Sequence, residues 1–206
     1  GPAVVSDAVV RFERVGATDA EAGLTAVELT RRARLRSAED RASFTAAHLL
    51  VRECAGELLG VAGHGLVVAQ SCATCGRVGH GRPTIVGHPE VHVSLSHTRG
   101  CVAAMAARSS CGIDVESVHR GPLPSAVLTE REASWVRAEA EPALAFTTLW
   151  VRKEALVKAG SGSIETVGSL DVLDAEHRLG VRAWAEPPYV GAWVVPNQAP
   201  RAVLRP

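Results

Sequence analysis

Gly112-Ile113-Asp114-Val115-Glu116 is the stretch that decides how the fold is interpreted. It predicts a strand, and side chains two positions apart on a strand project from the same face. Asp114 and Glu116 are therefore expected to lie side by side. Paired carboxylates of this kind suit a hard cation such as Mg²⁺, which prefers oxygen ligands.

A second stretch, Trp150–Lys158, predicts a helix about forty residues further along the chain. Trp150, Glu154 and Lys158 are four residues apart and so lie along one stripe of that helix. If the helix meets the strand at 112–116, three carboxylates and one ammonium group converge. Acidic oxygens around a metal, with a lysine beside them, favour phosphoryl-type chemistry.

Each stretch has a plainer interpretation when it is taken alone. An acidic pair on a half-exposed strand is usually a solvated face. A Glu–Lys pair four residues apart on a helix is a common surface pair that contributes about 0.2–0.5 kcal/mol. Only the flanking residues make the functional interpretation the stronger one.

The overall composition excludes several classes of protein. The chain has 206 residues, with 22 Lys plus Arg and 22 Asp plus Glu, so no net field draws it to nucleic acid or membrane. No apolar run reaches the roughly 18–20 residues that span a bilayer, and a cytoplasmic location is expected. The initial Gly1-Pro2 resembles a scar left by tag cleavage.

Helix starts are predicted at Thr25, Ser37 and Thr129, each followed three residues later by an acid, and Pro142 suits a first helical turn. Gly60 and Gly160 are expected to end helices. The apolar run 102–107 and the strand at 111–116 are predicted to form a hairpin across a short turn, within an antiparallel meander. Further strands are predicted at 66–70, 91–97, 170–173, 181–184 and 190–195.

An internal echo favours two related halves. Leu49–Arg52 with Gly60 matches Leu149–Arg152 with Gly160 at an offset of one hundred residues. We therefore expect an α/β (α+β) fold with mainly antiparallel sheets, built by pseudo-twofold duplication of two similar subdomains. The expected limits are 1–103 and 104–206, with the active site at their interface. Such a chain would be a pseudo-dimeric monomer.

Two more segments suit phosphate. Gly79–Pro83 contains glycines that let a backbone approach a ligand closely, and Arg82 can pair with a phosphate through two nitrogens. Ser94–Thr98 brings hydroxyls and His97 to the end of a predicted strand. Alone, the first is an ordinary turn, and a single loop histidine is more often structural.

In order, these segments are Gly-Arg-Pro, Ser-Leu-Ser-His, Gly-Ile-Asp-Val-Glu and Trp-x-x-Lys-Glu-Ala-x-x-Lys. The series closely resembles the 4′-phosphopantetheinyl transferases of the surfactin-synthetase-activating type, over most of the chain. The resemblance implies transfer of the 4′-phosphopantetheine arm from coenzyme A to a serine of acyl or peptidyl carrier proteins. Adenosine 3′,5′-bisphosphate leaves, and the carriers serve polyketide and non-ribosomal peptide biosynthesis.

The resemblance also implies roles for individual residues. Asp114, Glu116 and Glu154 would hold Mg²⁺, and Glu154 would also accept the serine proton. Asp114, Glu154 and Lys158 form the expected catalytic set. Contacts with coenzyme A are expected from Arg36, Arg41, Arg77, Gly81, Arg82, Pro83, Ser96, His97 and Lys158.

This sequence departs from the family pattern in three places. Arg82 stands where the family often has lysine, which changes the geometry of the contact. Thr98-Arg99-Gly100 follows His97 where the family often has an aromatic residue. The arginines of the first helix do not align unambiguously.

Cys72-x-x-Cys75 has the spacing of half a zinc site, which His80, His64 or His88 could extend. Two reduced cysteines in a glycine-rich loop is the favoured interpretation. Two rival functions stay open: another Mg²⁺-dependent phosphotransferase or hydrolase, and a zinc-stabilised interaction module.

Overall fold

The computed structural model describes residues 7–16, 21–71 and 75–196. Strands and helices alternate irregularly along the chain, and three short 3₁₀ turns complete the regular structure of these residues. The strands are β1 (Ala8–Arg14), β2 (Val68–Ser71), β3 (Val78–Ile85), β4 (His92–Thr98), β5 (Cys101–Ala107), β6 (Gly112–Ser117), β7 (Arg182–Glu186) and β8 (Tyr189–Val194). The helices are α1 (Ala26–Arg32), α2 (Ala38–Leu59), α3 (Glu130–Ala138), α4 (Pro142–Lys158) and α5 (Ala175–Arg178).

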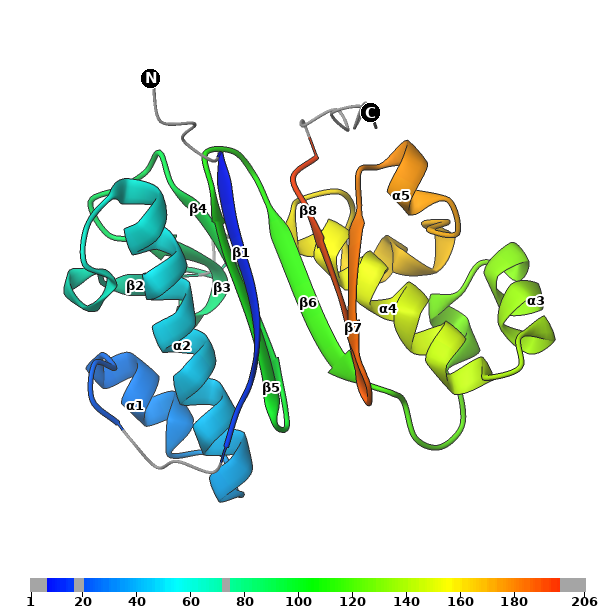
Figure 1. Cartoon of the computed structure of the whole chain (residues 1–206), viewed down its shortest axis with the longest axis horizontal. Helices are drawn as coiled ribbons and strands as arrows, with labels where there is room; N and C mark the ends of the chain where they lie inside the picture. The colour runs from blue at the N-terminus through cyan, green and yellow to red at the C-terminus, as the bar shows by residue number, and fades with distance from the viewer. Residues whose placement is uncertain (1–6, 17–20, 72–74, 197–206) are drawn as a thin grey trace, which may run out of the picture.

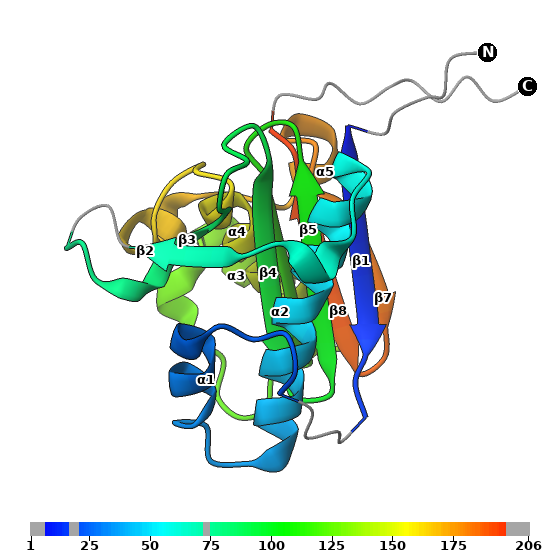
Figure 2. The same cartoon turned by 90° about the vertical axis from the view of Figure 1, so that its left-hand side faces the viewer.

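The described residues form two antiparallel sheets that stand side by side in the middle of the molecule (Figure 1). The first has the order β1-β5-β4-β3-β2 and the second the order β6-β8-β7. Helices α1 and α2 cover the outer side of the first sheet, as Figure 2 shows, while α3, α4 and α5 lie beyond the second. The expected α+β fold with mainly antiparallel sheets is therefore confirmed.

Each sheet packs a helix on its outer face, and the two inner faces pack on each other. Strand β5 is buried along its whole length because α2 lies on one side of it and the second sheet on the other. Its alanines are small enough to allow both layers to approach. At the edge of the inner core, Phe12 and Trp184 stack with their ring centroids 4.5 Å apart.

The predicted helix ends are confirmed by their capping bonds. Thr25 and Thr129 form capping boxes, and the Ser37 hydroxyl accepts from the N–H of Asp40. Pro142 occupies the first turn of α4. Gly60 ends α2 with a φ of 72°, a left-handed conformation that favours glycine.

The predicted hairpin between residues 102–107 and 111–116 is wrong. β5 pairs with β4 and β1, while β6 pairs with β8 in the other sheet. The N–H groups of Ile113 and Val115 donate to the hydroxyls of Ser94 and Ser96 at 3.1 and 3.3 Å. Serine side chains thus replace a backbone ladder between β4 and β6, and the sheet divides there.

The predicted strand at 170–173 is also wrong. These residues follow a 3₁₀ turn, and their backbone groups bind side chains instead of a neighbouring strand. The N–H of Val172 donates to Glu132 at 2.8 Å, and the carbonyl of Leu170 accepts from Lys153 at 2.6 Å. The apolar residues of this segment do not distinguish a strand from a loop whose backbone is bound by the buried side chains of Glu132 and Lys153.

The hundred-residue echo corresponds to similar structure. Arg52 on α2 donates to the carbonyl of Leu66 at 3.1 Å, and Arg152 on α4 donates to that of Val172 at 3.2 Å. Each arginine thereby holds the segment that follows its own helix. The chain passes from one sheet to the other at residues 108–111, and the domain limits 1–103 and 104–206 stay a prediction.

Within the described ranges, none of the helices combines the length and the apolar character needed to cross a membrane.

Candidate active site

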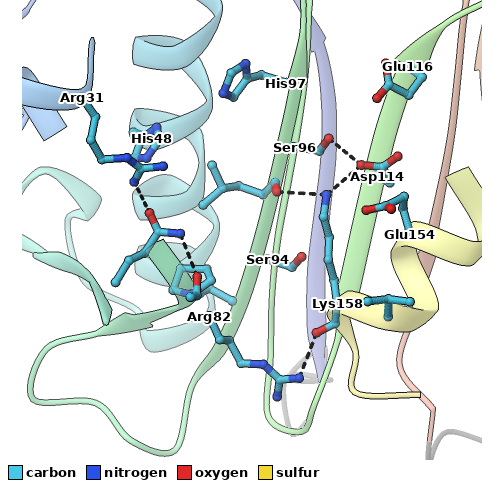
Figure 3. A pocket seen from close by; sticks show the side chains of 16 residues that line it. Arg31, His48, Arg82, Ser94, Ser96, His97, Asp114, Glu116, Glu154 and Lys158 are labelled. Atoms are coloured by element: carbon cyan, nitrogen blue, oxygen red, sulfur yellow. Dashed lines mark hydrogen bonds and ion pairs between the residues drawn. The ribbon is translucent and has the colours of Figure 1, made fainter. Parts of the chain in front are cut away.

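A cavity of about 550 Å³ lies between the two sheets, where β3 and β4 face β6 and α4 (Figure 3). Most of the predicted site residues line it, although they come from both halves of the chain. They are Gly81, Arg82, Pro83, Ser96, His97, Asp114, Glu116, Glu154 and Lys158.

Asp114 lies at the centre of this group and is buried. Its Oδ1 accepts from the Lys158 ammonium and from the Ser96 hydroxyl, both at 2.7 Å. Its Oδ2 is buried and has no hydrogen-bond partner among the described residues. A buried carboxylate oxygen left in this way is costly, and a ligand or ion would satisfy it.

Lys158 is anchored by more than its ion pair. Its Nζ also donates to the carbonyl of Ile113 on β6 at 3.1 Å, and it lies 3.5 Å from that of Leu95 on β4. The ammonium therefore sits between the two sheets, where Figure 3 shows its dashed contact with Asp114. A fixed positive charge in a cavity of this size suits an anionic group.

Glu116 and Glu154 flank Asp114 on either side (Figure 3). Burial, followed by the Asp114 charge, raises the pKa of Glu116 to about 7. The same two causes raise the pKa of Glu154. Three carboxylates in one cavity with a single lysine nearby favour extra cationic charge, from protons or from a metal.

His97 projects from β4 on the other side of the cavity (Figure 3). Burial lowers the pKa of its imidazole, and the charges of Lys158 and Arg31 add to the effect. Its ring meets Phe44 of α2 edge-on at 5.8 Å. A neutral imidazole held in this way can donate one hydrogen bond to a phosphate oxygen.

Three residues of the cavity wall were missed as specific candidates: Arg31, His48 and Gln70. Arg31 of α1 donates to the Gln70 side chain, whose amide donates to the carbonyl of Gly81 at 3.1 Å. No sequence signal singled out Arg31 among the arginines of this region, because the burial of Glu28 on the inner side of α1 is seen only in the structure.

Arg36, Arg41 and Arg77 do not line the cavity as it is formed by the described residues. Arg41 instead donates to the carbonyls of Leu35 and Arg36, at 3.1 and 3.2 Å, and holds the loop before α2. Arg36 and Arg77 are exposed. Their expected contacts with coenzyme A stay predictions.

Two of the five proposed zinc ligands lie outside what the structure describes. Cys72 lies outside the described residues, as does the side chain of His80, while Cys75 is exposed. Among the residues that are described, no group of three or more His, Cys, Asp or Glu side chains is arranged to hold a metal.

One comparison bears on the identity of this site. Residues 110–194 match the family model ACPS, described as the 4′-phosphopantetheinyl transferase superfamily. The match covers less than half of the chain, yet it contains β6 and α4 and hence Asp114, Glu116, Glu154 and Lys158. No curated protein matches the chain.

The second half therefore carries a domain of the kind found in phosphopantetheinyl transferases, which suggests phosphopantetheine transfer. Ser96, His97 and Arg82 lie outside the matched segment, although the fold brings them to the same cavity.

Proposed function

We propose that the protein transfers the 4′-phosphopantetheine arm of coenzyme A to a serine hydroxyl of an acyl or peptidyl carrier protein. The products are the modified carrier and adenosine 3′,5′-bisphosphate. We further propose that the enzyme is of the surfactin-synthetase-activating type and acts as a pseudo-dimeric monomer.

One observation carries the proposal: Asp114 and Lys158, both in the matched segment, form an ion pair inside a cavity that residues of both halves line. A short ion pair fixes the ammonium at the centre of that cavity, where a pyrophosphate can meet it. The neutral His97 adds a hydrogen-bonding group on the opposite wall, and the hydroxyl of Ser96 holds Asp114 in place. The adenosine side of coenzyme A would then lie towards Arg31, Gly81 and Pro83.

Glu154 is the proposed proton acceptor. Its raised pKa makes it a stronger base than an ordinary carboxylate, and general bases work best when their pKa approaches the operating pH. The serine oxygen of the carrier bonds to the β-phosphorus of coenzyme A as its proton passes to Glu154. The bond from that phosphorus to the bridging oxygen breaks, and the bisphosphate leaves with the electron pair.

The acids also have the chemistry of a divalent-cation site, although in the described part of the chain no three of them are arranged around an ion. The free oxygen of Asp114 and the two high-pKa glutamates supply the hard oxygen donors that Mg²⁺ prefers. Asp114, Glu116 and Glu154 would hold the ion, and the bound ion would offset negative charge on the pyrophosphate.

The test is direct. The protein is incubated with MgCl₂, coenzyme A and a panel of purified apo carrier proteins, and each carrier is weighed intact. The expected result is the gain of one phosphopantetheine mass on at least one carrier, with none when its acceptor serine is changed to alanine. A well-folded protein that modifies no carrier of either type would overturn the proposal.

A parallel reaction without carrier separates the rival enzyme class. Release of bisphosphate from coenzyme A in that reaction would indicate a hydrolase.

A further inference from the structure

Arg82 makes a contact that crosses from one half of the molecule to the other. It lies on β3 in the first sheet, yet its Nη2 donates to the carbonyl of Lys158 at the end of α4, at 3.0 Å (Figure 3). Its Nη1 lies 3.5 Å from the Ser110 hydroxyl, which itself donates to the carbonyl of Ala159 at 2.6 Å. The carbonyls of the last residue of α4 and of its C-cap, Ala159, are thus bound from outside the helix.

These bonds meet a physical need of the helix. The last four carbonyls of an α-helix lack partners within it, and the helix dipole favours a cation there. A Cβ at Gly160 would lie 3.2 Å from Nη2 of Arg82, so glycine leaves room for the guanidinium next to the helix end. Arg82 therefore stabilises the last turn of α4, and Lys158 belongs to that turn.

The backbone and side chain of Lys158 are held at two separate points. The carbonyl is bound by Arg82, while Nζ lies 2.7 Å from Asp114 Oδ1. If the last turn of α4 frays, the backbone of Lys158 is no longer held in place, and its ammonium can move away from Asp114. Small displacements of a catalytic group cost activity because the reacting atoms must be aligned.

The first half contains a similar bond from an arginine to a carbonyl near a helix end, without an acid and a lysine like Glu154 and Lys158 on that helix. Arg108 donates through Nη2 to the carbonyl of Leu58 at 3.0 Å, near the end of α2. Leu58 stands one hundred residues before Lys158 and occupies the same place in the echo. Arg108 and Arg82 thus make similar bonds to two corresponding helices, of which only α4 carries the proposed acid and lysine, Glu154 and Lys158.

We propose that Arg82 is a positioning residue for Lys158 and acts through the last turn of α4 rather than by binding a phosphate of coenzyme A. This inference rests on the proposed transfer reaction for its catalytic consequence. Its structural part, the clamp between β3 and α4, can be tested without any turnover.

The first experiment is amide hydrogen exchange on the whole protein. Arg82→Ala is expected to speed exchange in residues 155–160, while Arg108→Ala speeds it in residues 55–60 and leaves 155–160 unchanged. Unaltered exchange at 155–160 in Arg82→Ala, with the protein folded, would overturn the clamp. This result does not depend on which reaction the protein catalyses.

The second experiment compares coenzyme A with 3′-dephospho-coenzyme A as donors to one carrier. For Arg82→Ala we expect kcat to fall on the order of tenfold with both donors and the KM for coenzyme A to stay within about twofold. Arg82→Lys should recover part of the lost kcat, because an ammonium can also donate to the Lys158 carbonyl. Arg108→Ala should keep wild-type kcat.

Other outcomes have clear meanings. A rise in KM for coenzyme A that disappears with the dephospho donor would identify a direct phosphate contact and overturn the inference. An absence of transfer by the wild type would count against the proposed function, and hydrogen exchange would still decide the clamp.

Discussion

The single residue on which the site depends most is Asp114. It is the counterion of Lys158 and the acceptor for Ser96, and its buried Oδ2 has no hydrogen-bond partner within the described ranges. One side chain therefore determines both the position of the ammonium and the charge felt by the neighbouring glutamates. Few substitutions here can be neutral.

We predict that Asp114→Asn lowers kcat for carrier modification by about 10²-fold or more, because the ammonium loses the charge that orients it. The chain offers a control in Asp174, an exposed carboxylate that pairs with Arg131 at 2.9 Å on the surface. Asp174→Asn should retain full activity in the same mass assay. Near-normal turnover by a folded Asp114→Asn protein would remove Asp114 from the mechanism.

His48 predicts a pH dependence of stability. It is 2% exposed, and burial lowers the pKa of its imidazole to about 4, while an unfolded histidine keeps the ordinary 6.5. As the pH falls from 6.5 towards 4, the unfolded chain binds a proton that the folded protein does not. The contribution of the neutral ring is therefore complete above pH 6.5 and is lost as the pH falls towards 4.

Urea unfolding of the wild type and of His48→Gln at pH 7, 6 and 5 tests this. The wild type should lose up to about 1.4 kcal/mol per pH unit more than the variant below pH 6.5. His177→Gln, which changes an exposed histidine, should follow the wild type. Parallel curves for wild type and His48→Gln would contradict the prediction.

At the scale of elements, helix α4 is supported by a buried ion pair. Lys153 and Glu132 have side chains that are 0% exposed and lie 2.8 Å apart, joining α4 to α3. Lys153 also donates to the carbonyls of Val167 and Leu170, at 2.8 and 2.6 Å. Lys153, the neighbour of Glu154 in the chain, thus fixes the segment that follows α4.

Lys153→Met should lower the free energy of unfolding by about 3–5 kcal/mol, because it leaves Glu132 charged and unpaired in the core. Adding Glu132→Gln to that variant should recover part of the loss. Arg131→Ala, which breaks the two ion pairs of an exposed arginine, should cost no more than about 1 kcal/mol. Chemical denaturation measures all three, and an equal cost for the two single variants would refute the idea.

The elements differ in how well the sequence predicts them. Caps such as Thr25 and Thr129 are local, since three or four residues contain all the partners, and these predictions were correct. The strand at 170–173 failed because its backbone binds side chains from far along the chain. The position of the acids in one cavity was predictable from their spacing together with the flanking segments, whereas the position of Arg31 depends on how α1 packs.

At the scale of the whole molecule, the inner core joins the halves more than any single bond does. Gly191 on β8 is one place where they touch most closely. A Cβ there would overlap the ring of Phe12 on β1 and come within 2.9 Å of the carbonyl of Asp114. The hairpin predicted from residues 102–116 missed this arrangement, because no local pattern reveals that a sheet divides.

Gly191→Ala is expected to destabilise the protein by about 1–3 kcal/mol, as overpacking in a core does. Gly65→Ala is the matched control, because a Cβ at Gly65 would have nothing within 4 Å. Its effect should stay within about 0.5 kcal/mol. Urea unfolding decides between them, and equal stabilities would show that the ring of Phe12 can move aside at little cost.

The short connection at residues 108–111 limits how the two sheets can move apart. Four residues between Ala107 and Gly112 span at most roughly 17 Å when fully extended, so the sheets cannot part far at that end. At the opposite end the halves meet through weaker links, such as the Tyr189 hydroxyl donating to the carbonyl of Arg99 at 2.9 Å. Any widening that admits a bulky protein substrate must therefore occur as a wedge that opens at the Tyr189 end.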